Sequence, residues 1–152
     1  MLAQSIRKQI LVEASQARAF RVFTEELGTW WPLATHHIGA KAAETAILEP
    51  HAGGRWFERA EDGTECQWGK VLTWDPPGRL VLAWQIGADF KPDPDLVLEV
   101  EIRFVALAPA LTRIELEHRD LERLGDAAER LGASFERGWG EILGLYAKHA
   151  AG

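Results

Sequence analysis

The sequence predicts an α+β fold in which a curved antiparallel sheet of about seven strands wraps around a long C-terminal helix. The first observation is the order of hydrophobic patterns: a strand and a helix, then short-looped strands, then a last helix. Strands joined by tight turns are antiparallel neighbours, so the middle of the chain forms a meander. The second observation is the apolar stripe along the last helix, which needs a surface of its own length. The inner face of the bent sheet is that surface.

The composition predicts one globular domain over residues 1–152, with 47% hydrophobic residues and a net charge of −6. At this length a core forms without a disulfide or a structural metal. The single cysteine, Cys66, excludes an intrachain disulfide. The chain has 17 Lys and Arg against 23 Asp and Glu, with no basic cluster, so we expect no nucleic-acid partner. We expect neither a cofactor nor a bound metal.

The sequence also predicts a cytoplasmic protein without membrane insertion. Its start, Met1–Lys8, is polar and charged where a secretory signal has an apolar run. The longest apolar stretch runs only from Phe104 to Ala108 before Pro109 interrupts it. Roughly 20 apolar residues are needed to cross a bilayer, so this stretch is far too short.

The first strand is predicted over residues 6–14 and the first helix over residues 16–27. Ser15 suits the N-cap of this helix because its hydroxyl can accept a hydrogen bond from a free amide of the first turn. Apolar residues then recur every three to four positions. Gly28 is predicted to end the helix.

Beyond an irregular segment that ends at Gly39, apolar residues recur with a period of two. Asp62-Gly63 is typical of a hairpin turn, and Pro76-Pro77-Gly78 is typical of a chain reversal. Prolines exclude residues 87–95 from the centre of a sheet, so this segment is a loop. Strands are predicted over residues 45–48, 55–60, 66–74, 80–86, 96–104 and 112–118.

The last helix is predicted to begin at an Asp126 cap, with Glu129 three positions later as in a capping box. It runs for about 24 residues, or about 36 Å. Its apolar stripe comprises Ala128, Leu131, Phe135, Trp139, Ile142 and Tyr146. The facing side of the sheet is predicted to comprise Leu82, Trp84, Leu98, Val100, Ile102, Ile114 and Leu116.

Several segments with this order of elements resemble the SRPBCC superfamily, also called START-like or Bet v-like helix-grip proteins. The similar branch is the one named after activators of the heat-shock protein 90 ATPase, mostly small bacterial proteins. The resemblance extends from Ile6 to Tyr146. The segments are Trp30-Trp31-Pro32-Leu33 with His36 and Gly39, Gly53-Gly54-Arg55-Trp56, Asp62-Gly63, Trp68-Gly69-Lys70-Val71, Asp75-Pro76-Pro77-Gly78-Arg79-Leu80 and Glu117-His118-Arg119.

The resemblance implies a deep cavity between helix and sheet that binds a hydrophobic small molecule, which is a lipid, a polyketide or an aromatic-like compound. In relatives this cavity serves transport, sensing, or cyclase and hydroxylase-partner chemistry. The candidate ligand-binding residues are His118, Glu58, Trp68, Trp84, Phe104, Phe135, Trp139 and His36.

The candidate residues have different expected roles. The aromatic side chains form walls. His118 ends the apolar face of its strand and therefore points inward, and Glu58 shares a face with Trp56, so both are candidate polar anchors. His36 is a candidate polar gate on a loop over the cavity mouth. Gln85 is predicted to face outward.

Each candidate also has a simpler interpretation. The aromatic residues can be ordinary core, His118 can be held by a backbone group, and Glu58 and His36 can face solvent. The adjacent pair His36-His37 lacks the spacing of a metal site. Cys66 has no basic neighbour in the sequence and is predicted to be an inert thiol.

Three function hypotheses follow. The leading one is binding of a hydrophobic small molecule. The second is a polyketide cyclase-like or hydrolase-like enzyme in which His118 or Glu58 acts as general base, although no strong catalytic signature is present. The third is a co-chaperone-like activator of an ATPase, which only the resemblance suggests. An exposed sheet edge and Trp30-Trp31 are candidate surfaces for a homodimer.

Overall fold

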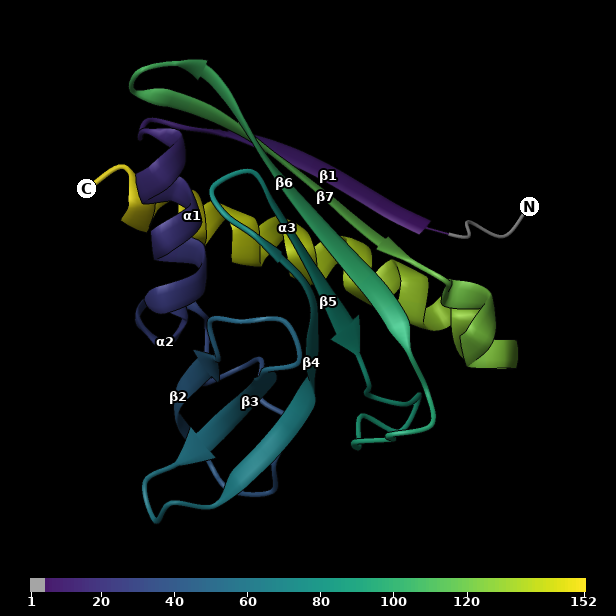
Figure 1. Cartoon of the computed structure of the whole chain (residues 1–152). Coiled ribbons are helices and arrows are strands. Elements are labelled where there is room, and N and C mark those ends of the chain that lie inside the picture. Colours follow the sequence, from purple (N-terminus) through teal and green to yellow (C-terminus); the bar gives the residue numbers. More distant parts are fainter. Residues whose placement is uncertain (1–4) are drawn as a thin grey trace.

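The structure is a computed structural model that describes residues 5–152, so the first four residues of the polar start segment lie outside the described residues. Its sheet has seven antiparallel strands in the order β1-β7-β6-β5-β4-β3-β2 and bends around a long helix, α3 (Figure 1). This arrangement confirms the predicted α+β helix-grip fold. The strands are β1 (Ser5–Val12), β2 (Ala43–Leu48), β3 (Arg55–Ala60), β4 (Glu65–Asp75), β5 (Arg79–Trp84), β6 (Leu98–Ala108) and β7 (Leu111–Arg119).

The helices lie on one side of this sheet. They are α1 (Gln16–Glu25), α2 (Leu27–Trp30) and α3 (Ala128–Ala150), and a 3₁₀ helix, η1 (Leu121–Ala127), leads into α3. None of the helices within residues 5–152 is long and apolar enough to span a membrane.

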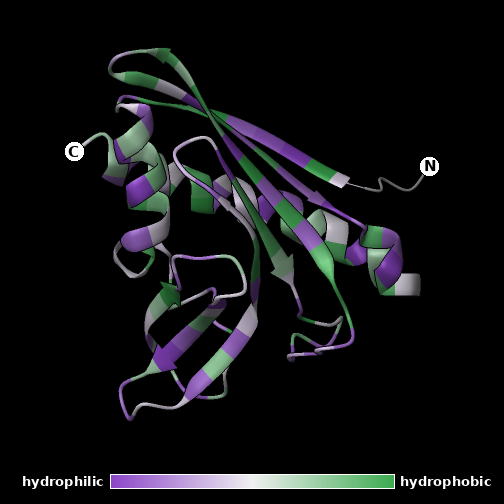
Figure 2. Cartoon of the chain, viewed as in Figure 1, coloured by the Kyte–Doolittle hydropathy of each residue, from purple (hydrophilic) through white to green (hydrophobic). Residues whose placement is uncertain are grey.

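The core lies between α3 and the concave face of the sheet. Leu98, Val100 and Ile102 of β6 alternate toward this face and are fully buried, and Figure 2 shows hydrophobic and hydrophilic residues alternating along the strand. Burying one such side chain contributes about 1.5–3 kcal/mol. At the C-terminal end of α3 the Tyr146 hydroxyl donates to the Ala19 carbonyl of α1 at 2.6 Å. The helix is therefore held both by apolar packing and by α1.

The first helix begins as predicted and ends differently. Ser15 Oγ accepts a hydrogen bond from the Arg18 amide at 3.2 Å, which confirms the N-cap. The prediction that Gly28 ends this helix is wrong, because α1 stops at Glu25 and Gly28 lies inside α2. A Cβ at Gly28 would lie 2.1 Å from the Thr45 hydroxyl. This glycine therefore permits close packing of α2 on β2.

The predicted Asp126 cap is also wrong. Asp126 lies inside η1, and Ala127 stands at the N-cap of α3 without a side-chain hydrogen bond. Gly125, with a φ of 62°, makes the bend between η1 and α3. This left-handed backbone favours glycine, so the chain enters α3 through a glycine bend.

Gln85 is buried, which corrects the prediction that it faces outward. It follows the last residue of β5, so strand alternation no longer sets its direction. Its side-chain amide donates to the Pro94 carbonyl at 3.0 Å, and its own carbonyl accepts from the Asp93 amide at 2.8 Å. The Gly87 carbonyl accepts from the Phe90 amide at 2.9 Å. The loop over residues 86–95 is thus braced by bonds to the preceding residue, Gln85, and by a bond within the loop.

A β-bulge directs Trp68 toward the core. The β3–β4 register pairs Phe57 with Gln67 and Trp56 with Gly69, so Trp68 is the extra residue. A bulge bends its strand and redirects a side chain. Trp68 is 1% exposed and its ring lies 5.4 Å from that of Trp56. The bulge therefore places two indoles on the concave face.

Gly69 is required beside this bulge, because a Cβ there would lie 1.7 Å from the Ala83 carbonyl oxygen. We predict that Gly69→Ala lowers the free energy of unfolding by about 1–3 kcal/mol, as overpacking typically does. The matched control is Gly140→Ala, since a Cβ at Gly140 meets no atom within 4 Å. Because alanine favours a helix, this control should gain up to about 1 kcal/mol. Urea denaturation measures both, and equal stability of the two variants would contradict the steric argument.

Candidate ligand-binding site

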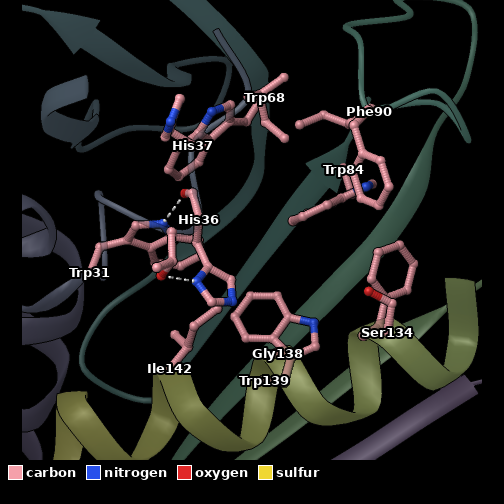
Figure 3. Close-up of a pocket in the computed structure, with 14 residues that line it drawn as sticks. Trp31, His36, His37, Trp68, Trp84, Phe90, Ser134, Gly138, Trp139 and Ile142 are labelled. Carbon is pink, nitrogen blue, oxygen red and sulfur yellow. Dashed lines mark hydrogen bonds between the residues drawn. The ribbon is translucent and has the colours of Figure 1, made fainter. Parts of the chain in front are cut away.

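A cavity of about 280 Å³ lies between α3, the segment over residues 31–38, β4, β5 and the loop that follows β5. Figure 3 shows α3 along one side, with Trp84 and Phe90 across the cavity from Trp31 and His36. Aromatic side chains form most of the wall, and hydroxyl and imidazole groups supply its polar part. The aromatic residues are Trp31, Trp68, Trp84, Phe90, Phe135 and Trp139, and the polar ones are Thr35, His36, His37 and Ser134.

The indole rings of the wall contact one another at different angles. The ring centroid of Trp31 lies 5.0 Å from that of Trp68, at an interplanar angle of 38°, and 5.9 Å from that of Trp139, at an angle of 85°. The ring centroid of Trp84 lies 6.3 Å from that of Trp139 and 5.4 Å from that of Phe135. Edge-to-face and tilted contacts at these distances are favourable for aromatic pairs. These contacts link five aromatic residues of the wall: Trp31, Trp68, Trp84, Phe135 and Trp139.

Glu58 lies behind this wall and joins the loop to the sheet. Its side chain is 3% exposed, and one oxygen, Oε1, accepts from both the Ile38 amide and the Trp68 indole N–H, the latter at 2.8 Å. A Cβ at Gly39 would lie 3.1 Å from the other oxygen, so this glycine lets the loop approach the carboxylate. Burial raises the pKa of the Cys66 thiol, and the charge of Glu58 raises it further.

His118 also lies behind the wall. It is 0% exposed, and its ring stacks on Phe135 with centroids 4.5 Å apart. The Trp139 indole N–H donates to His118 Nδ1 at 3.0 Å, so the proton of the neutral ring is on Nε2. Burial lowers the pKa of His118 to about 3, because a charged ring would be desolvated. His118 is therefore a neutral residue that orients Trp139.

Two adjacent histidines line the cavity from the loop. His36 Nδ1 lies 2.8 Å from the Thr35 hydroxyl, and its backbone carbonyl accepts from the Trp31 indole N–H at 2.9 Å. His37 Nδ1 lies 3.0 Å from the Gly39 carbonyl. Within residues 5–152 no three His, Cys, Asp or Glu side chains are grouped as metal ligands.

The structure brings together five of the eight candidate residues as cavity lining: Trp68, Trp84, Phe135, Trp139 and His36. Three candidates are not among the described lining residues. Glu58 and His118 are the buried groups behind the wall. Phe104 packs against Phe20 and Phe23 of α1, with centroids 5.0 and 5.8 Å away, which corrects its expected place as a wall.

The sequence reasoning did not assign Trp31, His37, Phe90 and Ser134 to the cavity, although all four line it. Trp31, His37 and Phe90 lie outside the strands and helices, where no periodicity indicates a direction. Ser134 precedes Phe135 on α3, and its place next to that stripe residue was the available signal.

Comparison with known proteins agrees with this fold. The chain belongs to the family of activator of Hsp90 ATPase homolog 1-like proteins, whose family model matches residues 13–148. This match confirms the resemblance seen in the sequence. Comparison with curated proteins gives no match.

Solved structures give full-length matches. An anthrahydroquino-gamma-pyrone synthase, Txn09, complexed with SUM, is 37% identical, with 97% of each chain covered and a TM-score of 0.69. The self-sacrificing resistance protein CalC from Micromonospora echinospora is 29% identical, with 96% of this chain and 93% of that chain covered and a TM-score of 0.73. Protein NE0264 from Nitrosomonas europaea shares the fold at 14% identity, 97% and 94% coverage and a TM-score of 0.69.

The lowered pKa of His118 predicts that stability depends on pH. A histidine in the unfolded chain titrates near 6.5, whereas folded His118 has a pKa of about 3. Between these values the unfolded state binds more protons, so the stabilisation present above pH 6.5 is lost as the pH falls. At 1.36 kcal/mol per pH unit, His118 should cost the wild type about 1.5 kcal/mol of unfolding free energy between about pH 6.5 and 5.

Urea denaturation at both pH values tests this prediction. The matched variant is His118→Gln, whose amide oxygen can still accept from Trp139 while the side chain does not titrate. Its loss of stability over the same pH interval should be smaller by about 1.5 kcal/mol. Parallel losses in the two proteins would show that His118 is not the group responsible.

Proposed function

We propose that the protein binds a flat, oxygen-bearing aromatic compound of polyketide type in the cavity beside α3. The observation that carries this proposal is the aromatic wall, in which four indoles and two phenyl rings line one cavity. Aromatic faces offer large contact areas to planar ligands. A hydrophobic small molecule is therefore the ligand class that the site favours.

The size and stiffness of the cavity support a compact ligand. About 280 Å³ lies near the lower end of the usual range for small-molecule sites. Three wall indoles are held in place by their own N–H groups: Trp31 donates to the His36 carbonyl, Trp68 to Glu58 and Trp139 to His118. A wall fixed in this way suits a rigid ring system better than a long acyl chain.

The polar lining supports a ligand that bears oxygen atoms. Thr35 and Ser134 offer hydroxyl groups, and His36 and His37 offer ring nitrogens. A few polar groups in an apolar pocket orient a ligand and provide selectivity. The ligand's carbonyl or phenol groups would meet these residues while its rings meet the indoles.

The comparisons support the same chemical class. The relative that is 37% identical is named as an anthrahydroquino-gamma-pyrone synthase, and this name denotes a polycyclic aromatic product with ring oxygens. The family description names an ATPase activator, and the hypothesis of a co-chaperone role rests on that description alone. The cavity therefore favours small-molecule binding over the co-chaperone hypothesis.

Two glycines of α3 provide a matched test. Gly138 lines the cavity, and a Cβ there would lie 3.8 Å from His36 Nε2, so a larger side chain would enter the cavity without a backbone clash. Gly140 is exposed on the same helix. We predict that Gly138→Leu weakens binding of 1,8-dihydroxyanthraquinone at least about tenfold, or about 1.4 kcal/mol, while Gly140→Leu leaves it unchanged.

Quenching of tryptophan fluorescence by the anthraquinone measures the dissociation constant. Dodecanoate serves as the acyl-chain competitor. Equal weakening by the two leucine variants, or tighter binding of dodecanoate than of the anthraquinone, would argue against a flat aromatic ligand in this cavity.

A further inference from the structure

We propose that His37 is a general base of the cavity, which removes a proton from a phenolic or 1,3-dicarbonyl group of the bound compound, and that Glu58 is its positioning residue. This inference rests on the proposed function and adds a chemical step to binding. It assigns the base to a residue other than His118 and Glu58, the two that the sequence suggested.

The hydrogen bond to Gly39 fixes the tautomer of His37. Its Nδ1 lies 3.0 Å from the Gly39 carbonyl oxygen. A carbonyl oxygen only accepts hydrogen bonds, so Nδ1 must carry the proton. In the neutral ring the lone pair is then on Nε2. Because His37 lines the cavity with a side chain that is 28% exposed, this basic nitrogen belongs to a residue that a ligand can reach.

Glu58 lies near the same nitrogen, Nδ1, of this ring. Its Oε2 lies 4.0 Å from His37 Nδ1. Its Oε1 accepts from the Ile38 amide and from Trp68, so the carboxylate is held between the loop and β4. When Nε2 takes up a proton the ring becomes a cation, and a fixed carboxylate behind Nδ1 offsets that charge. The arrangement thus couples a cavity-lining imidazole to a buried countercharge.

The other titratable groups near the cavity lack this combination. The partner of His36 Nδ1 is the Thr35 hydroxyl, which can both donate and accept, so the tautomer of His36 is not fixed. Its carboxylate neighbour, Glu141, is 69% exposed and lies 3.9 Å from Nε2, the nitrogen opposite the Thr35 contact. His118 is fully buried, and its Nδ1 already accepts from Trp139. His37 is therefore the residue that the geometry favours.

The proposed step balances with the ligand and the imidazole alone. An O–H bond of a phenol, or a C–H bond between two carbonyl groups, breaks. The electron pair stays on the ligand as a phenolate or an enolate, and the proton passes to His37 Nε2. The imidazolium then returns the proton to another atom of the ligand anion or to solvent.

A model reaction tests the base without knowledge of the natural ligand. 5-Nitrobenzisoxazole is a flat bicyclic compound: a base removes its ring C–H proton, the N–O bond breaks and a coloured cyanonitrophenolate forms. We expect the full chain to accelerate this reaction and 1,8-dihydroxyanthraquinone to inhibit it competitively. His37→Asn should lower kcat/KM about 100-fold, within the usual contribution of a general base.

Two further variants separate the base from the fold. His51 Nδ1 also lies near a backbone carbonyl, that of Ala52 at 3.1 Å, but His51 is exposed and is not among the cavity-lining residues. His51→Asn should leave the rate unchanged. Glu58→Gln keeps an oxygen that can accept from Ile38 and Trp68, so the loop should stay in place and KM should stay constant. The neutral amide does not offset the charge of the imidazolium, so kcat should fall. Circular dichroism and thermal unfolding confirm that each variant is folded.

The outcomes distinguish the two proposals. If the wild type binds the anthraquinone but does not accelerate the reaction, or if His36→Asn and not His37→Asn abolishes the acceleration, the assignment of His37 is overturned. An equal fall in kcat for folded His51→Asn and His37→Asn would also overturn it. If the wild type does not bind the anthraquinone, the proposed function itself fails.

Discussion

The buried carboxylate of Glu58 attaches the cavity-lining segment over residues 31–39 to the sheet. The segment over residues 31–39 contains no strand, so no ladder of backbone bonds attaches it to the sheet. Glu58 provides the attachment, because its Oε1 accepts from the loop at Ile38 and from the sheet at Trp68. A buried carboxylate is costly unless it is well paired, so both donors are needed for Glu58 to remain there. The positions of His37 and of the indole wall depend on this junction.

Two of the buried polar side chains, Glu58 and His118, orient indole rings of the wall. His118 offers an unprotonated nitrogen to Trp139 and a flat face to Phe135. Burial keeps this histidine neutral by lowering its pKa to about 3, so it continues to accept from Trp139 over a wide range of pH. A ring that is fixed by a hydrogen bond loses little further freedom when a ligand packs against it. The side chains of the wall therefore lose their conformational entropy during folding and lose little more of it on binding.

The strand and helix patterns predicted much of the fold and a smaller part of the site. Alternation on β7 correctly predicted that His118 points inward, and the stripe of α3 correctly placed Phe135 and Trp139 toward the sheet. Alternation also placed Phe104 on the inner face, but it did not indicate that α1 covers that end of the sheet. The role proposed for His37 depends on Glu58, a residue far along the chain, and on a loop without periodicity. Such long-range contacts leave no local signal.

The loop over residues 86–95 has a consequence for how proteins of this kind diversify. Its hydrogen bonds run within the loop at Gly87 and to the adjacent Gln85 at Asp93 and Pro94, while its Phe90 forms part of the cavity. A connection that braces itself can change in length or composition without disturbing the register of the strands on either side. Phe90 thus places one part of the cavity wall outside the strands and helices, and exchange of this one connection is a route to new selectivity on an unchanged scaffold.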